Sequence, residues 1–128
     1  SFFFSSARKA TNSLKASGSC SFIPGIVSDG YVDTELGKLQ FICENISKVP
    51  GQEMELLIHP KDFKAAVSES GIGTISSKEF RNGESILHIK LQSGMELELH
   101  QPPNPEFAYG TKVELQLVKN SPFIAFKR

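Results

Sequence analysis

Apolar and polar residues alternate along two neighbouring stretches in the second half of the chain. The apolar positions of these stretches are Leu87, Ile89, Leu91, Met95, Leu97 and Leu99. An apolar residue at every second position predicts a strand with one buried face. Asn82-Gly83 precedes the first stretch, and Asn-Gly favours a two-residue hairpin turn because both residues tolerate positive φ angles. Residues 71–100 therefore predict three successive antiparallel strands. The first of them, Thr74 to Phe80, alternates poorly, and we expect a β-bulge or a sharp bend within it.

The register of the second hairpin follows from matching its apolar faces. A three-residue loop, Gln92-Ser93-Gly94, brings both apolar faces to the same side and places Gly94 where a left-handed residue is needed. A two-residue loop would instead pair Gln92 with Met95 and set the faces on opposite sides. The three-residue loop predicts the pairs Leu91–Met95, Ile89–Leu97, Leu87–Leu99, Lys90–Glu96 and His88–Glu98. The last two pairs are favourable across a strand pair.

Glycines and prolines divide the rest of the chain into short strand-like runs. The expected strands are Ser21 to Val27, Tyr31 to Glu35, Leu39 to Cys43, Glu53 to His59, Val113 to Leu117 and Phe123 to Phe126. We expect Lys61 to Val67 to form one helical turn or a short loop. Gln101 to Pro105 is expected to be a crossing loop, because prolines donate no backbone hydrogen bond.

About eight short strands without a long amphipathic helix indicate an all-β protein. We predict paired small barrels of the oligonucleotide/oligosaccharide-binding (OB) type that share strands and contain short Greek-key or meander elements. The barrel domain would cover residues 21–128, with two intertwined subdomains at approximately 21–70 and 71–128. Residues 1–20 are expected to be a linker or a truncated leader, because the basic residues follow Phe2 to Phe4 instead of preceding them as in a signal peptide.

Composition limits the function further. The 128 residues carry 14 basic and 14 acidic side chains, and the formal net charge is +0. This balance argues against a strong electrostatic attraction to nucleic acid or anionic lipid. No apolar run approaches the roughly 20 residues that a membrane-spanning helix needs, so we expect no direct membrane insertion. Cys20 and Cys43 fit no metal-ligand spacing and favour thiols in a reducing compartment.

The sequence contains no motif that predicts catalysis or a bound cofactor. It has no G-x-x-x-x-G-K-[ST] motif, no nucleophile elbow and no closely spaced cysteine pair. The best metal candidates are His88, Glu98 and His100, which the predicted register puts on one polar face. The two histidines would be diagonal and about 7–8 Å apart, which is long for one shared ion, so a solvated strand face is the favoured interpretation. His59 ends a strand before Pro60, where a structural role is expected.

Five segments occur in an order that resembles a known family. They are Phe22 to Val27, Asp29 to Leu39, Leu57 to Asp62, Gly73 to Leu97, and Gly110 to Leu117. This order is similar to the C-terminal regulatory domain of the ATPase subunits of ABC importers, particularly of the ferric-iron type, and the fourth segment resembles its TOBE repeat. Pro60 and Asp62 match the family's Arg-Pro-Glu-Asp motif, whereas His59 and Lys61 replace its Arg and Glu.

The resemblance implies a non-catalytic regulatory and dimerisation module made of TOBE-type barrels. Its partners would be an ABC ATPase domain, which this sequence does not contain, a second copy of the chain in a homodimer, and indirectly the membrane permease. The implied location is the cytoplasm, peripheral on the inner face of the plasma membrane, and solute sensing is an implied activity. Phe2 to Phe4, Phe107 and Tyr109 are apolar residues that the expected strands do not bury, which makes them interface candidates.

Two other function classes stay open. One is a free-standing OB-type oligonucleotide-binding module, which would need basic residues interleaved with exposed aromatic residues on one face. The other is a small oxyanion-binding or metal-binding domain related to molybdate-binding domains. Salt-dependent binding to single-stranded DNA or RNA would favour the first. Binding of molybdate, sulfate, phosphate or Fe(III) would favour the second.

Overall fold

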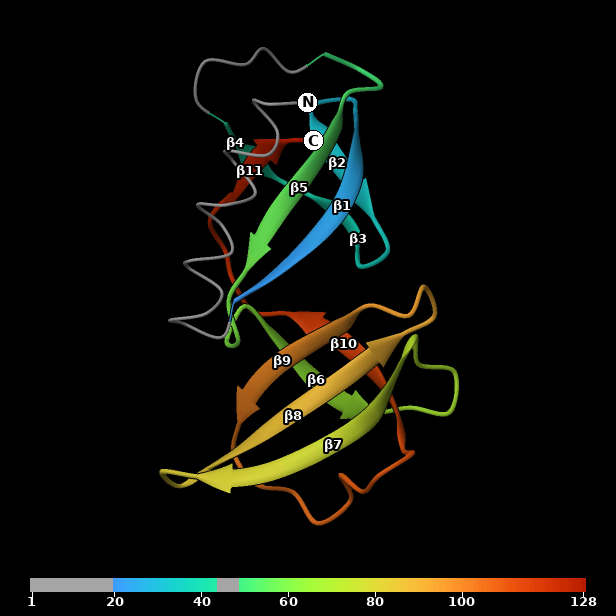
Figure 1. Ribbon diagram of the computed structural model, residues 1–128, viewed down its shortest axis with the longest axis vertical. Helices are drawn as coiled ribbons and strands as arrows, with labels where there is room; N and C mark the ends of the chain where they lie inside the picture. The colour runs from blue at the N-terminus through green and yellow to red at the C-terminus, as the bar shows by residue number, and fades with distance from the viewer. Residues whose placement is uncertain (1–19, 44–48) are drawn as a thin grey trace. The chain divides into compact units, whose positions relative to one another are not determined.

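The computed structural model describes residues 20–43 and 49–128, and these residues are all-β (Figure 1). Phe2 to Phe4 lie outside the described residues. The strands are β1 (Ser21–Ser28), β2 (Tyr31–Thr34), β3 (Gly37–Leu39), β4 (Phe41–Ile42), β5 (Glu53–Ile58), β6 (Phe63–Val67), β7 (Gly73–Arg81), β8 (Glu84–Leu91), β9 (Glu96–Gln101), β10 (Lys112–Leu117) and β11 (Phe123–Lys127). The described residues contain no helix, and hence none that could cross a membrane.

The strands belong to two compact units. The first unit runs to Ile58 and includes Ser121–Arg128, and the second unit is the continuous segment His59–Asn120. The second unit is therefore inserted in chain order between the two parts of the first unit. The boundary expected near residue 70 lies earlier, because β6 pairs with β10 of the second unit.

The prediction of a helical turn or loop at residues 61–67 is wrong over most of its length. A turn follows Pro60, but β6 then begins at Phe63 and pairs antiparallel with β10 along its whole length. Buried Phe63 and Ala65 alternate with exposed Lys64, which is the period of a strand. A distant partner strand therefore decides the conformation of this segment.

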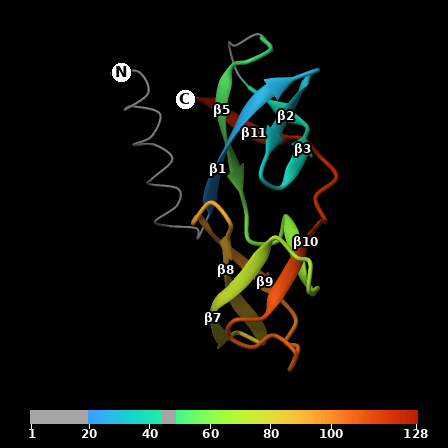
Figure 2. The same ribbon diagram turned by 90° about the vertical axis from the view of Figure 1, so that its right-hand side faces the viewer.

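The first unit is a six-stranded sheet in the order β3-β2-β1-β5-β11-β4. β1 pairs antiparallel with both β2 and β5, and Figure 2 shows β2 and β3 as a hairpin at the edge of the sheet. Gly25 is required within β1, because a Cβ atom there would lie 2.3 Å from Val32 Cγ1. β11 pairs antiparallel with β5 and parallel with β4, so the last strand of the chain completes this sheet.

The second unit is a five-stranded sheet in the order β6-β10-β7-β8-β9. The predicted register of β8 and β9 is confirmed: Leu87 pairs with Leu99, and Lys90 pairs with Glu96. Leu91 closes the three-residue loop by donating its N–H to Met95 O at 2.8 Å. The predicted buried face is also confirmed, with Leu87, Ile89, Leu91, Leu97 and Leu99 all buried. Asn82, Gly83 and Gly94 have the positive φ angles that the two turns require.

Two features curve the second sheet into an almost closed barrel. The predicted irregularity in β7 is a bulge between Ile75 and Ser77, and bulges increase strand twist. The two edge strands, β6 and β9, are then joined by the Gln101 side chain. Its Oε1 accepts from Ala65 N–H at 2.8 Å, and its Nε2 donates to Ala65 O at 3.1 Å. The side-chain amide thus makes the two hydrogen bonds that a neighbouring strand would make.

The proline-rich loop after β9 folds back on the second unit. Phe107 is buried, with 3% of its surface exposed, so it is a core residue and not the exposed interface residue that we expect from sequence. Asn104 holds the loop by accepting hydrogen bonds from Phe107 N–H and Glu106 N–H. Tyr109, by contrast, is 83% exposed.

Candidate functional site

His88, Glu98 and His100, the metal candidates, lie together on the outer face of the second sheet. Each carboxylate oxygen of Glu98 faces one imidazole: Oε1 lies 3.1 Å from His88 Nε2, and Oε2 lies 2.6 Å from His100 Nε2. Ser77 Oγ lies 2.6 Å from His88 Nδ1. The hydrogen bonds thus link three strands, β7, β8 and β9.

This arrangement is a bridged pair of His–Glu contacts and does not resemble a metal centre. The two Nε2 atoms point to different oxygens of the same carboxylate, whereas metal ligands converge on one point. Within residues 20–43 and 49–128, no group of three or more His, Cys, Asp or Glu side chains is placed to hold a metal ion. The sequence predicts a single His–Glu pair on this face, whereas the structure links Ser77, His88, Glu98 and His100 through side-chain hydrogen bonds.

His59, Pro60 and Asp62, the family-motif positions, form the turn that leads into β6. Asp62 Oδ2 accepts a hydrogen bond from His59 N–H at 2.8 Å, and Asp62 N–H donates to His59 O at 3.0 Å. The Asp62 carbonyl accepts from Val118 N–H, and the Pro60 carbonyl accepts from His100 N–H. These backbone contacts anchor the turn to the ends of β9 and β10, which is a structural role.

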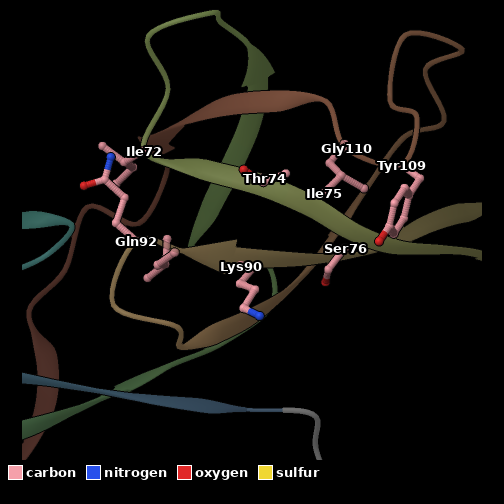
Figure 3. Close-up of a pocket in the computed structure, with 9 residues that line it drawn as sticks. Ile72, Thr74, Ile75, Ser76, Lys90, Gln92, Tyr109 and Gly110 are labelled. Atoms are coloured by element: carbon pink, nitrogen blue, oxygen red, sulfur yellow. The ribbon is translucent and has the colours of Figure 1, made fainter.

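A surface pocket of about 340 Å³ lies over the junction of β7 and β8 (Figure 3). Its polar lining residues are Thr74, Ser76, Lys90, Gln92 and Tyr109. Lys90 and Ser76 extend to the same side of the sheet, and the Tyr109 hydroxyl is directed toward the Ser76 end of the pocket (Figure 3). Ser76 Oγ donates to His88 O at 3.1 Å, so its hydrogen is already used. The pocket is large compared with the roughly 30 Å³ per molecule in liquid water.

The strand register extends this polar site across the sheet. Thr74 lies directly opposite Lys90 on one side and directly opposite Lys112 on the other. Directly opposed residues of antiparallel strands share a face, and their Cβ atoms are about 5 Å apart. Both lysines are exposed and Thr74 is half-buried. A hydroxyl between two ammonium groups is a donor set for an anion.

Sequence reasoning did not single out this site. The sequence predicts Lys90 only as the partner of Glu96, and it predicts no role for Thr74 or Lys112. The β7–β10 pairing that brings Lys112 beside Thr74 joins residues 38 positions apart (112 − 74). The period-2 placement of Lys90 on the polar face of its strand is the only local signal.

A second pocket, of about 440 Å³, lies at the other end of β7. Phe80, Pro103 and Pro105 supply its apolar lining, and Lys78 and Glu79 also line it. Phe80 is 68% exposed. The basic and acidic side chains are mixed here, so this pocket offers no basic groove of the kind that tracks a nucleic-acid backbone.

Comparisons with known proteins identify the fold. No family model matches the chain, and no curated protein matches it by sequence. A crystal structure of the cytoplasmic molybdate-binding protein ModG, with molybdate bound, is similar with a TM-score of 0.62 and 14% identity. The match covers 84% of this chain and 96% of that chain. At this identity the likeness shows the fold alone, and the fold is a pair of OB-like barrels of the TOBE type.

Proposed function

We propose that this chain is a non-catalytic regulatory module that binds a small oxyanion of the molybdate class. The observation that carries the proposal is the shared paired-barrel fold, which extends over 96% of the molybdate-bound ModG chain. The neutral overall charge and the exposed lysines that flank Thr74 are consistent with a small anionic ligand. The described residues also offer no arrangement that resembles a metal centre.

The proposal extends to the protein's context. The module regulates the ATPase subunit of an ABC importer on the cytoplasmic face of the plasma membrane, and it senses the solute that the importer delivers. The order of the five family-like segments supports this context, and an oxyanion takes the place of ferric iron as the solute. A P-loop motif encoded immediately upstream of this sequence would support the importer context. An upstream gene without one would count against it.

Calorimetry on the full chain tests the ligand class. Molybdate, sulfate, phosphate and Fe(III) are titrated separately, and a single-stranded oligonucleotide is titrated at low and high salt. We expect saturable binding of molybdate with a stoichiometry near an integer. If the chain binds Fe(III) and none of the oxyanions, the ligand is a metal ion and the oxyanion proposal is wrong. Tight, salt-dependent binding of the oligonucleotide would favour the OB-type nucleic-acid module instead.

The module is proposed to act as a homodimer. β3 and β4 are the edge strands of the first sheet, and unpaired edges are commonly covered or used for assembly. Sedimentation of the full chain at tens of micromolar should give a dimer mass. A chain lacking residues 1–19 serves as the comparison, because a dimer that survives this truncation places the interface on the barrels. A monomeric full chain would refute the dimer.

A further inference from the structure

The outer face of the second unit carries a row of polar side chains that crosses three neighbouring strands. Lys112 of β10, Thr74 of β7 and Lys90 of β8 are consecutive partners in the antiparallel register. The row beneath them, one residue along each strand, is Val113, Gly73 and Leu91, and its two side chains are buried. Alternation across a strand therefore confirms that the Lys–Thr–Lys row faces outward.

The two lysines are available to a ligand. In the part of the chain that the structure describes, neither Lys90 nor Lys112 lies within ion-pair distance of a carboxylate. Glu96 is the nearest acidic group by register, directly opposite Lys90 on β9. Strands in a sheet are about 4.8 Å apart, so the two lysine Cα atoms are about 10 Å apart with Thr74 between them. Side chains as long as lysine can converge over Thr74 from that separation.

We propose that Lys90, Thr74 and Lys112 bind the oxyanion, with the Thr74 hydroxyl as the central donor and one ammonium group on each side. This inference rests on the proposed function and locates its ligand. A dianion such as molybdate matches two positive charges, and the hydroxyl fixes one of its oxygens by a charge-assisted hydrogen bond. Gln92 and Tyr109 line a surface pocket together with Lys90 and Thr74, and they offer further N–H and O–H donors. Lys112 reaches the site from the neighbouring strand β10, beside Thr74.

Glu96 affects which anions the site can bind. A carboxylate next to Lys90 repels an approaching anion and lowers the affinity of the pocket for it. A nucleic-acid backbone is longer than the row, so its phosphates would also pass over Glu96. The Glu96 carboxylate would repel them. The row is therefore suited to a small compact oxyanion and not to a polyanion.

The test measures molybdate affinity by calorimetry in five single variants of the full chain. Lys90→Gln and Lys112→Gln remove one charge each, and Thr74→Val removes the hydroxyl while keeping the shape. We expect each to weaken binding roughly tenfold, as the loss of a charged hydrogen bond does. Lys64→Gln is the matched control, because it removes the same charge from the exposed face of β6. Glu96→Gln should tighten binding several-fold, which a merely structural loss cannot do.

The outcomes separate the two proposals. If the wild-type chain binds no oxyanion, the proposed function and this site both fail. If the wild type binds and the double variant Lys90→Gln/Lys112→Gln binds equally well, the site is wrong and the proposed function stands. Backbone amide shifts in an NMR titration give a second readout, since residues 74, 90 and 112 should shift and residue 64 should not. Circular dichroism of each variant excludes unfolding as the cause of lost binding.

Discussion

The two units use the same kinds of strands and turns but are completed in different ways. The second unit is one continuous segment, and its edge strands are joined by the Gln101 side chain. The first unit is completed by β11 from the end of the chain, and its other edge strand, β4, pairs parallel with β11. Local sequence therefore specifies most of one unit, whereas the other depends on a strand that arrives after the whole second unit.

The turns show what the units have in common. Asp29 and Gly30 connect β1 to β2 with φ angles of 52° and 81°, and Asn82 and Gly83 connect β7 to β8 with 52° and 80°. Two positive φ angles in succession define the type I′ hairpin, whose twist matches that of the flanking strands. The same turn conformation occurs in both units. The units differ in how the edge strands of their sheets are paired.

The largest expected effect is the loss of a core side chain from the second unit. Leu97 is 1% exposed, and Leu97→Ala should lower the free energy of unfolding by about 2–5 kcal/mol, because it leaves a cavity. Urea denaturation measures the change, and hydrogen exchange should increase more in residues 59–120 than in the first unit. Leu117→Ala is the matched control because Leu117 is 52% exposed. Equal losses for the two variants would contradict the assigned core.

The next largest effect is expected from the loss of the Gln101 hydrogen bonds that join β9 to β6. Gln101→Leu removes both hydrogen bonds to Ala65 and leaves a backbone donor and acceptor without their partner, which should cost about 1–3 kcal/mol of unfolding free energy. Hydrogen exchange at the Ala65 amide should accelerate. Gln116→Leu is the control, since the Gln116 side chain is exposed and bonds only to Glu114 in the described residues. An unchanged Ala65 amide in Gln101→Leu would mean that the side chain does not close the barrel.

The sequence predicts the second unit best where neighbouring residues decide the structure. Asn82-Gly83, the alternating leucines and the need for Gly94 together determine the β7–β8–β9 meander and its register. β6 is missed because Pro60 and two alanines give a weak strand signal, and its conformation depends on β10 about fifty residues away. The parallel pairing of β4 with β11 has no local signature at all.

The candidate site is predictable only in part for the same reason. His88 and Glu98 come together through a hairpin register that can be worked out from sequence. The row of Lys112, Thr74 and Lys90 needs the β7–β10 pairing, which joins segments that are far apart in the sequence. The burial of Phe107 is also non-local, because the apolar residue lies in a loop that alternation does not describe.

Equal effects are expected from the two equivalent turns. Gly30→Ala and Gly83→Ala should each lower the free energy of unfolding by about 1–2 kcal/mol, because an L-residue is disfavoured at positive φ. No atom lies within 4 Å of a Cβ built at either position, so the cost is conformational and not steric. Thermal unfolding of the two variants measures both. A large difference between them would show that one turn adjusts and the other does not.

The smallest effects concern two adjacent residues of the turn before β6. Asp62 is nearly buried, and its carboxylate accepts from His59 N–H, so Asp62→Ala should cost about 1 kcal/mol, as the loss of one such hydrogen bond does. Lys61 Nζ lies 3.1 Å from Glu84 Oε2, but its side chain is 69% exposed.

Exposed ion pairs contribute about 0–1 kcal/mol, so Lys61→Ala should have almost no effect, and any effect should disappear in high salt. Urea denaturation at low and high salt compares the two variants. Asp62→Asn is the informative third variant, because it keeps an oxygen acceptor for His59 N–H and removes the charge. If Asp62→Asn is as destabilised as Asp62→Ala, the charge near His59 matters more than the hydrogen bond, and the turn is held electrostatically.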